Sequence, residues 1–70
     1  MMPYLAKCTD GEKIYFFSIK QDNTTKNKWY CAMQNPFRKE YDTKVIYGGS
    51  VEIVRRKIDR QFKKFKESAK

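Results

Sequence analysis

Residues 48–68, GGSVEIVRRKIDRQFKKFKES, decide the fold of this 70-residue chain. Ser50 is a favoured helix N-cap residue, and no proline or glycine follows it. Apolar side chains then recur at spacings of three and four, which places them in one stripe along a helix. The stripe consists of Val51, Val54, Ile58, Phe62, Phe65 and Ala69. We therefore predict a helix over about residues 51–68 with one buried face.

The other side of this predicted helix is strongly basic. Residues 51–70 contain eight lysines and arginines against three acidic residues, a surplus of five within the chain's net charge of +8. A surplus of this sign favours anionic partners, such as nucleic acid or an acidic protein surface. A solvated helix face without any partner is the competing interpretation.

Upstream of the helix, Asp10-Gly11 predicts a tight hairpin. It lies between residues 3–9 and 12–20, two segments rich in strand-forming residues. Asp-Gly favours a two-residue turn with positive φ at both positions. We predict two antiparallel strands in which Thr9 lies opposite Glu12.

Two further strands are predicted over about residues 28–34 and 43–47, the first after a polar loop and the second after a charged connection. The second and third strands are expected to pair with Lys20 of the second opposite Lys28 of the third. Short connections favour a meander, so the expected fold class is α+β, a three- or four-stranded antiparallel sheet with one C-terminal helix packed on one face. Residues 1–70 are expected to form a single small basic domain.

Neighbouring positions of a strand point to opposite sides, so this register divides the sheet into two faces. The more apolar face is predicted to meet the helix and carries Tyr4, Ala6, Cys8, Tyr15, Phe17, Ile19, Trp29, Cys31 and Met33. The other face carries Leu5, Lys7, Ile14, Phe16, Ser18, Lys20, Lys28, Tyr30, Ala32 and Gln34. Cys8 and Cys31 would flank a middle strand, too far apart to bridge, so we predict free thiols inside the core.

The residue types offer little support for catalysis or metal binding. The chain has no histidine, and its two cysteines have no metal-ligand spacing. We therefore predict no enzyme activity, no metal site and no cofactor. No segment approaches the roughly 20 apolar residues that span a bilayer, and the first residues lack the pattern of a signal peptide, so a cytoplasmic protein is expected.

The leading functional prediction is a small non-catalytic nucleic-acid-binding or regulatory module. Aromatic rings with nearby cations on an open sheet face suit a nucleic acid, because any base stacks on a ring. Phe16 and Tyr30 are the predicted stacking residues. The predicted phosphate contacts are Lys20, Lys28, Arg38, Lys39, Arg56, Arg60 and Lys63.

Other interpretations of these residues stay open. A dimer interface, or closure by residues 37–41, would also account for apolar side chains on the second face. A different functional class is a protein–protein interaction factor of the phage or mobile-element type. Such a factor would dock on an acidic partner surface through the basic helix or through Phe16 and Tyr30.

The order of the motifs also resembles a known family. Lys28-Trp29-Tyr30, the basic pair Arg38-Lys39, a short strand and a helix are similar to the small arm-site DNA-binding domains at the amino end of phage and transposon tyrosine integrases. The likeness covers residues 12–68 and implies a three-stranded sheet against DNA with a helix behind it. The sequence departs from that family at the strand-to-helix junction, Gly48-Gly49-Ser50, and includes no catalytic domain.

Overall fold

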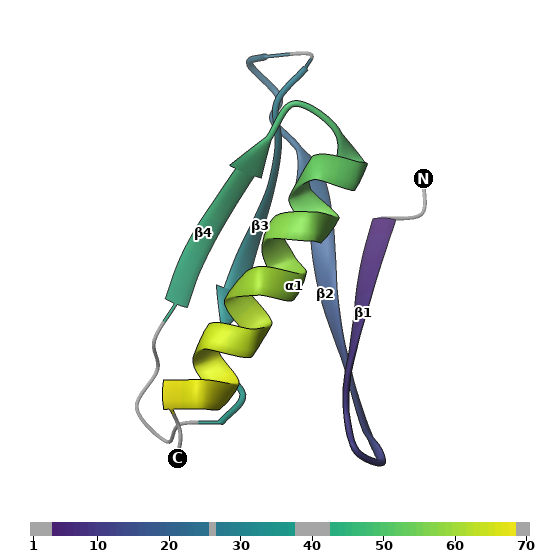
Figure 1. Cartoon of the computed structure of the whole chain (residues 1–70). Helices are drawn as coiled ribbons and strands as arrows, with labels where there is room; N and C mark the ends of the chain where they lie inside the picture. Colours follow the sequence, from purple (N-terminus) through teal and green to yellow (C-terminus); the bar gives the residue numbers. More distant parts are fainter. Residues whose placement is uncertain (1–3, 26, 38–42, 69–70) are drawn as a thin grey trace.

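The structure is a computed structural model that describes residues 4–25, 27–37 and 43–68 (Figure 1). Its elements in chain order are β1 (Tyr4–Asp10), β2 (Lys13–Gln21), β3 (Trp29–Gln34), β4 (Thr43–Gly48) and α1 (Val51–Ser68). The strands form one antiparallel sheet in the order β1-β2-β3-β4, and α1 lies across one face of it (Figure 1). The predicted α+β meander with a C-terminal helix is confirmed, and the predicted helix bounds are met. The first residue of the earliest predicted strand, residue 3, lies outside the described residues.

The β1–β2 hairpin turns one residue later than predicted. Asp10 pairs with Lys13, so the turn residues are Gly11 and Glu12, and only Gly11 has a positive φ, of 62°. Positive φ confined to a first-position glycine is typical of a type II′ turn, which also matches the twist of the strands. The predicted opposition of Thr9 and Glu12 is therefore wrong. Because each cross-strand partner moves by two positions, every side chain nevertheless keeps its predicted face.

The core lies between the sheet and α1 and closely follows the predicted faces. Its buried residues are Ala6, Cys8, Ile19, Cys31, Met33, Ile46, Val54, Ile58, Phe62 and Phe65. Tyr15, Phe17, Trp29, Phe37 and Val51 pack against this cluster while partly exposed. Tyr4 is the exception, because it is half exposed on β1, where its ring meets that of Trp29 at nearly a right angle, with centroids 5.4 Å apart. Ala69, the last residue of the predicted stripe, lies outside the described residues.

The start of α1 is fixed by a side-chain cap and a close backbone approach. The Ser50 hydroxyl accepts a hydrogen bond from the Ile53 N–H at 3.3 Å, as an N-cap residue does. Gly48 lies against the first turn of the helix. A Cβ atom at Gly48 would be 2.8 Å from Cγ2 of Ile53 and 3.0 Å from Cγ2 of Val54. The junction therefore needs a glycine at position 48 to let the strand and helix approach.

Replacing Gly48 by alanine is expected to destabilise the fold by about 1–3 kcal/mol, because the new methyl group overlaps side chains that begin α1. Gly49→Ala is the matched control, since its nearest neighbour would be the Asn27 carbonyl oxygen at 3.8 Å. Urea unfolding of both variants measures the difference. Equal midpoints would contradict the steric role given to Gly48.

Two helix cations cover the outer edges of the sheet. Nη2 of Arg55 donates to the Leu5 carbonyl of β1 at 3.3 Å, and Nζ of Lys57 donates to the Tyr47 carbonyl of β4 at 2.7 Å. Free backbone groups on an edge strand invite pairing with other chains, and these contacts occupy one carbonyl on each edge. Within the described part of the chain, no helix is long and apolar enough to cross a membrane.

β2 and β3 pair over a much shorter length than the other neighbouring strands. Only Lys20↔Tyr30 and Gln21↔Trp29 are paired, whereas β1 and β2 stay in register along the whole of β1. The predicted opposition of Lys20 and Lys28 is wrong by two positions, which again leaves the faces unchanged. Beyond these two pairs the strands separate toward the hairpin end of the sheet (Figure 1). The meander thus consists of two well-paired hairpins joined at one end.

Candidate nucleic-acid interface

The sheet face turned away from α1 carries many exposed side chains and no acidic ones. The four strands are fully described, and none of their aspartate or glutamate side chains points to this side. Every strand residue on it except the half-buried Tyr30 is exposed. We call this surface the open face; its strand residues are Leu5, Lys7, Thr9, Ile14, Phe16, Ser18, Lys20, Tyr30, Ala32, Gln34, Thr43, Val45 and Tyr47.

Three aromatic rings lie on the open face. Phe16 of β2 is 61 % exposed and Tyr47 of β4 is 47 % exposed. Tyr30 of β3 lies opposite Tyr47, with ring centroids 6.3 Å apart and planes tilted by 39°. Large aromatic side chains that project into solvent are typical of binding surfaces, because burying them on a partner gains much apolar area.

Lysines stand beside these rings. In the strand register Lys7 lies opposite Phe16, and Lys20 lies opposite Tyr30. Nζ of Lys28, just before β3, sits 4.7 Å from the Tyr47 ring centroid. Each exposed ring therefore has a cation next to it or opposite it.

One acidic group approaches the end of this surface. Asp22, just beyond β2, has a carboxylate oxygen 3.8 Å from Nζ of Lys28. Its carboxylate also accepts hydrogen bonds from the Thr24 N–H at 2.8 Å and the Thr24 hydroxyl at 2.7 Å. These two bonds, followed by the charge of Lys28, lower the pKa of Asp22 from its usual value. Asp22 thus stays ionised and offsets part of the Lys28 charge, which leaves Lys7 and Lys20 as the uncompensated cations of the open face.

The predicted site residues fall into two groups. Phe16, Tyr30 and Lys20 share the open face, and Lys28 adjoins it through Tyr47. The other described group is exposed on α1, on the far side of the core, and consists of Arg56, Arg60 and Lys63. Arg38 and Lys39 lie outside the described residues. A single short ligand segment on the open face therefore does not contact both groups, and the assignment of all these residues to one site stays a prediction.

The α1 side has features that weaken it as a separate phosphate site. Arg55 and Lys57 are bonded to strand carbonyls, and Nζ of Lys66 lies 2.6 Å from a carboxylate oxygen of Asp10. Asp59 also contributes negative charge on the same helix. Several of the eight cations counted in the sequence are thus used within the fold.

Among the aromatic rings and lysines of the open-face strand residues, Tyr47 and Lys7 are the two that the sequence analysis does not assign to the site. Tyr47 was missed because no register had been set for β4, although its position opposite Tyr30 places it on this face. Lys7 was predicted on the second face but not as a contact residue. The pairing of β3 with β4 is the signal that identifies Tyr47.

The two thiols belong to the core and are poor nucleophiles. Cys8 and Cys31 are free and buried, which confirms the prediction for both. The Cys8 thiol donates to Oδ1 of Asp59 at 3.7 Å. Burial, then the Asp59 charge and this hydrogen bond, raise the pKa of Cys8 to about 11, and burial raises the pKa of Cys31. Thiols held protonated at neutral pH react slowly.

Part of the connection between β3 and β4 packs away from the open face. The Phe37 ring lies 5.2 Å from the ring of Phe62 and 5.7 Å from that of Tyr15, measured between centroids. Phe62 is a core residue of α1, so Phe37 extends the core side of the sheet and leaves the open face uncovered. The rest of the segment that was expected to close the open face as an alternative, residues 38–41, lies outside the described residues.

Comparison with known proteins found no matching family model, no matching curated protein and no matching solved structure. The similarity to integrase arm-site domains therefore stays a prediction from the order of motifs. Among the described residues, no three histidine, cysteine or acidic side chains gather in a way that would hold a metal ion.

Proposed function

We propose that this chain is a non-catalytic nucleic-acid-binding module whose contact surface is the open face of the sheet. The observation that carries the proposal is the grouping of Phe16, Tyr30 and Tyr47 with Lys7 and Lys20 on a face that has no acidic strand residue. Rings supply stacking for bases, and the lysines supply charge for phosphates. The net charge of +8 would also attract a polyanion from a distance.

Salt dependence tests this function directly. Binding of a fluorescent oligonucleotide is expected to weaken as salt rises, because each phosphate contact releases a condensed counterion. If Lys7 and Lys20 each neutralise one phosphate of a single strand, log K should fall against log salt with a slope of about −1.4, at roughly −0.7 per contact. Fluorescence anisotropy at several salt concentrations gives the slope. Absence of binding to DNA and RNA, single or double stranded, at low salt would remove the proposal.

A second candidate is a protein-binding accessory factor that docks on an acidic partner. It is favoured by the exposed aliphatic side chains Leu5, Ile14 and Val45, which lie on the open face and offer nothing to a phosphate. The cations of the same face would complement an acidic rim on the partner. If no oligonucleotide binds in the salt titration, protein binding becomes the favoured function of the open face.

The cytoplasm is the proposed location. Two free cysteines are typical of a reducing compartment, where thiols are kept from pairing.

A further inference from the structure

We propose that the wedge-shaped gap between β2 and β3 receives the bases of a single-stranded nucleic acid, so that the ligand is single rather than double stranded. This inference rests on the proposed function and adds the form of the ligand and the place where its bases enter. A base inside a duplex is stacked and paired, and only an unstacked base enters a gap in a sheet.

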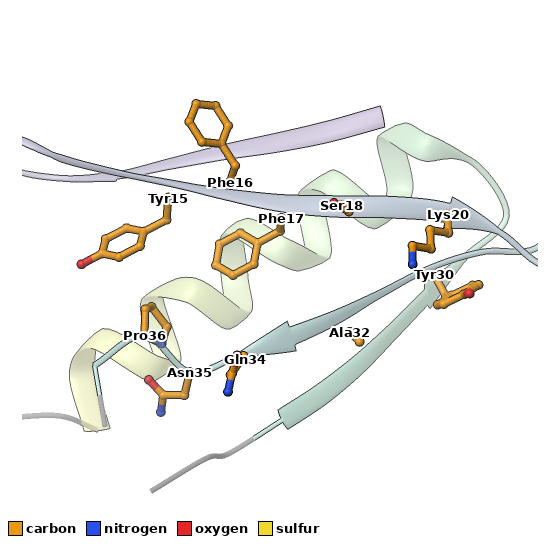
Figure 2. Close-up of a pocket in the computed structure, with 10 residues that line it drawn as sticks. All are labelled: Tyr15, Phe16, Phe17, Ser18, Lys20, Tyr30, Ala32, Gln34, Asn35 and Pro36. Carbon is orange, nitrogen blue, oxygen red and sulfur yellow. The ribbon is translucent and has the colours of Figure 1, made fainter. Parts of the chain in front are cut away.

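The gap follows from the short pairing of β2 with β3. The two strands meet at Lys20 and Tyr30 and diverge from there, as Figure 2 shows. Between them lies a groove of about 610 Å³, within the usual size range of small-ligand sites. The groove is lined by Tyr15, Phe16, Phe17, Ser18 and Lys20 on one side and by Tyr30, Ala32, Gln34, Asn35 and Pro36 on the other.

The walls of the groove offer backbone groups that no strand uses. Just beyond the paired residues, the Asp22 N–H donates to the Lys28 carbonyl at 2.8 Å. In an antiparallel pair every second residue directs its N–H and C=O toward the partner strand. The even-numbered residues of β2 therefore direct their backbone groups toward β3, and the even-numbered residues of β3 direct theirs toward β2. Continuing this register would place Ser18 opposite Ala32, but that pair does not form. Donors and acceptors on both walls therefore remain for water or a ligand. The edges of a base carry complementary donors and acceptors.

The floor of the groove is aromatic. Tyr15 and Phe17 point to the side of α1 (Figure 2), and their ring centroids lie 5.5 Å and 6.2 Å from that of Phe62. Phe16 projects from β2 to the opposite side (Figure 2), and it is also a lining residue of the groove. An entering base thus meets rings below and beside it and backbone groups along its edges.

The shape of the gap favours planar groups over an inserted β-strand. Neighbouring strands lie about 4.8 Å apart, so a strand inserted between β2 and β3 would need about twice that separation along its length. β2 and β3 are instead directly paired at Lys20↔Tyr30 and separate only beyond that point. Lys20 at this closed end would attract the phosphate that follows the entering base.

Filling the groove from either wall tests the inference. Ala32→Trp fills it from β3, and Ser18→Trp fills it from β2. Each has a cross-strand control on the open face but outside the groove, because Ala32 pairs with Val45 and Ser18 pairs with Leu5. Val45→Trp and Leu5→Trp therefore add the same ring to the same surface. The probe is fluorescein-labelled oligo(dT) about ten nucleotides long, within the span of known single-strand sites, with a DNA hairpin duplex of similar length as competitor.

We expect Ala32→Trp and Ser18→Trp to weaken oligo(dT) binding by about tenfold or more, the loss expected when a stacked base is displaced. Val45→Trp and Leu5→Trp, which add the ring to the open face outside the groove, should weaken binding clearly less than the two groove variants do. Circular dichroism confirms folding, and if one groove variant fails to fold, the other decides. With the wild-type protein, oligo(dT) should displace the labelled strand at lower concentration than the hairpin.

Wild-type affinity for oligo(dT) in both groove variants, or preference of the wild-type protein for the hairpin, would overturn the wedge as the base site. Either result would leave nucleic-acid binding by the open face intact. Absence of any binding by the wild-type protein would instead remove the proposed function itself.

Discussion

Ile58→Ala is expected to lower the free energy of unfolding by about 3 kcal/mol, within the roughly 2–5 kcal/mol range for truncating a buried isoleucine. Ile58 is 0 % exposed at the middle of α1, where the helix meets the sheet. A chain of this size has a stability of only about 3.5–10 kcal/mol, at roughly 0.05–0.15 kcal/mol per residue. The substitution would therefore remove about 30 % or more of the total. Thermal unfolding followed by circular dichroism should show a midpoint lower by about 12–24 °C.

Ile53→Ala is the matched control, because it makes the same chemical change in the same helix. Ile53 is 43 % exposed, and its side chain lies close to Gly48. We expect a loss of about 1 kcal/mol or less, since part of this side chain is in water before and after the change. Similar midpoints for the two variants would contradict the packing of α1 on the sheet through one apolar stripe.

The fold was accessible to sequence reasoning because its main signals are periodic. The stripe that includes Val54, Ile58 and Phe62 has the spacing of a helix, and the strands alternate with period two. Both predicted strand registers were wrong by two positions, yet both preserved the faces, because a side chain changes face only after an odd shift. Burial was therefore predictable even where the pairing was not.

The turn and the junction were less accessible because they depend on single atoms. Asp10-Gly11 indicates a hairpin but does not distinguish a turn over Asp10-Gly11 from one over Gly11-Glu12, since glycine suits both. The role of Gly48 depends on a 2.8 Å approach to a helix side chain. No local sequence pattern encodes such a contact between two elements.

The candidate site was predictable in its residue types and not in its layout. Phe16, Tyr30 and Lys20 were assigned to one face by alternation, and they share it. The cations of α1 were grouped with them for their charge alone, although the predicted stripe and faces already placed the helix cations across the core from Phe16 and Tyr30. The early separation of β2 from β3, which opens the groove, depends on twist and packing of the whole sheet rather than on a local motif.

Reversing two positive charges on the sheet, or two on α1, should show which surface binds nucleic acid. The double variant Lys7→Glu/Lys20→Glu is expected to weaken nucleic-acid binding by about a hundredfold, because each charge-assisted phosphate contact is lost and replaced by repulsion. Both lysines are exposed and lie opposite Phe16 and Tyr30 in the sheet. Fluorescence anisotropy at one fixed low salt concentration measures the change, and circular dichroism verifies the fold.

The double variant Arg56→Glu/Arg60→Glu is the control, since it lowers the net charge by the same four units from +8. Both arginines are exposed on α1, where they act on a ligand of the open face only through the screened field of the whole protein. We expect a loss of about threefold or less. Equal losses in the two double variants would mean that total charge governs binding, and a larger loss in the helix variant would move the contact surface to α1. Only a loss concentrated in the sheet variant supports local contact by Lys7 and Lys20 on the open face.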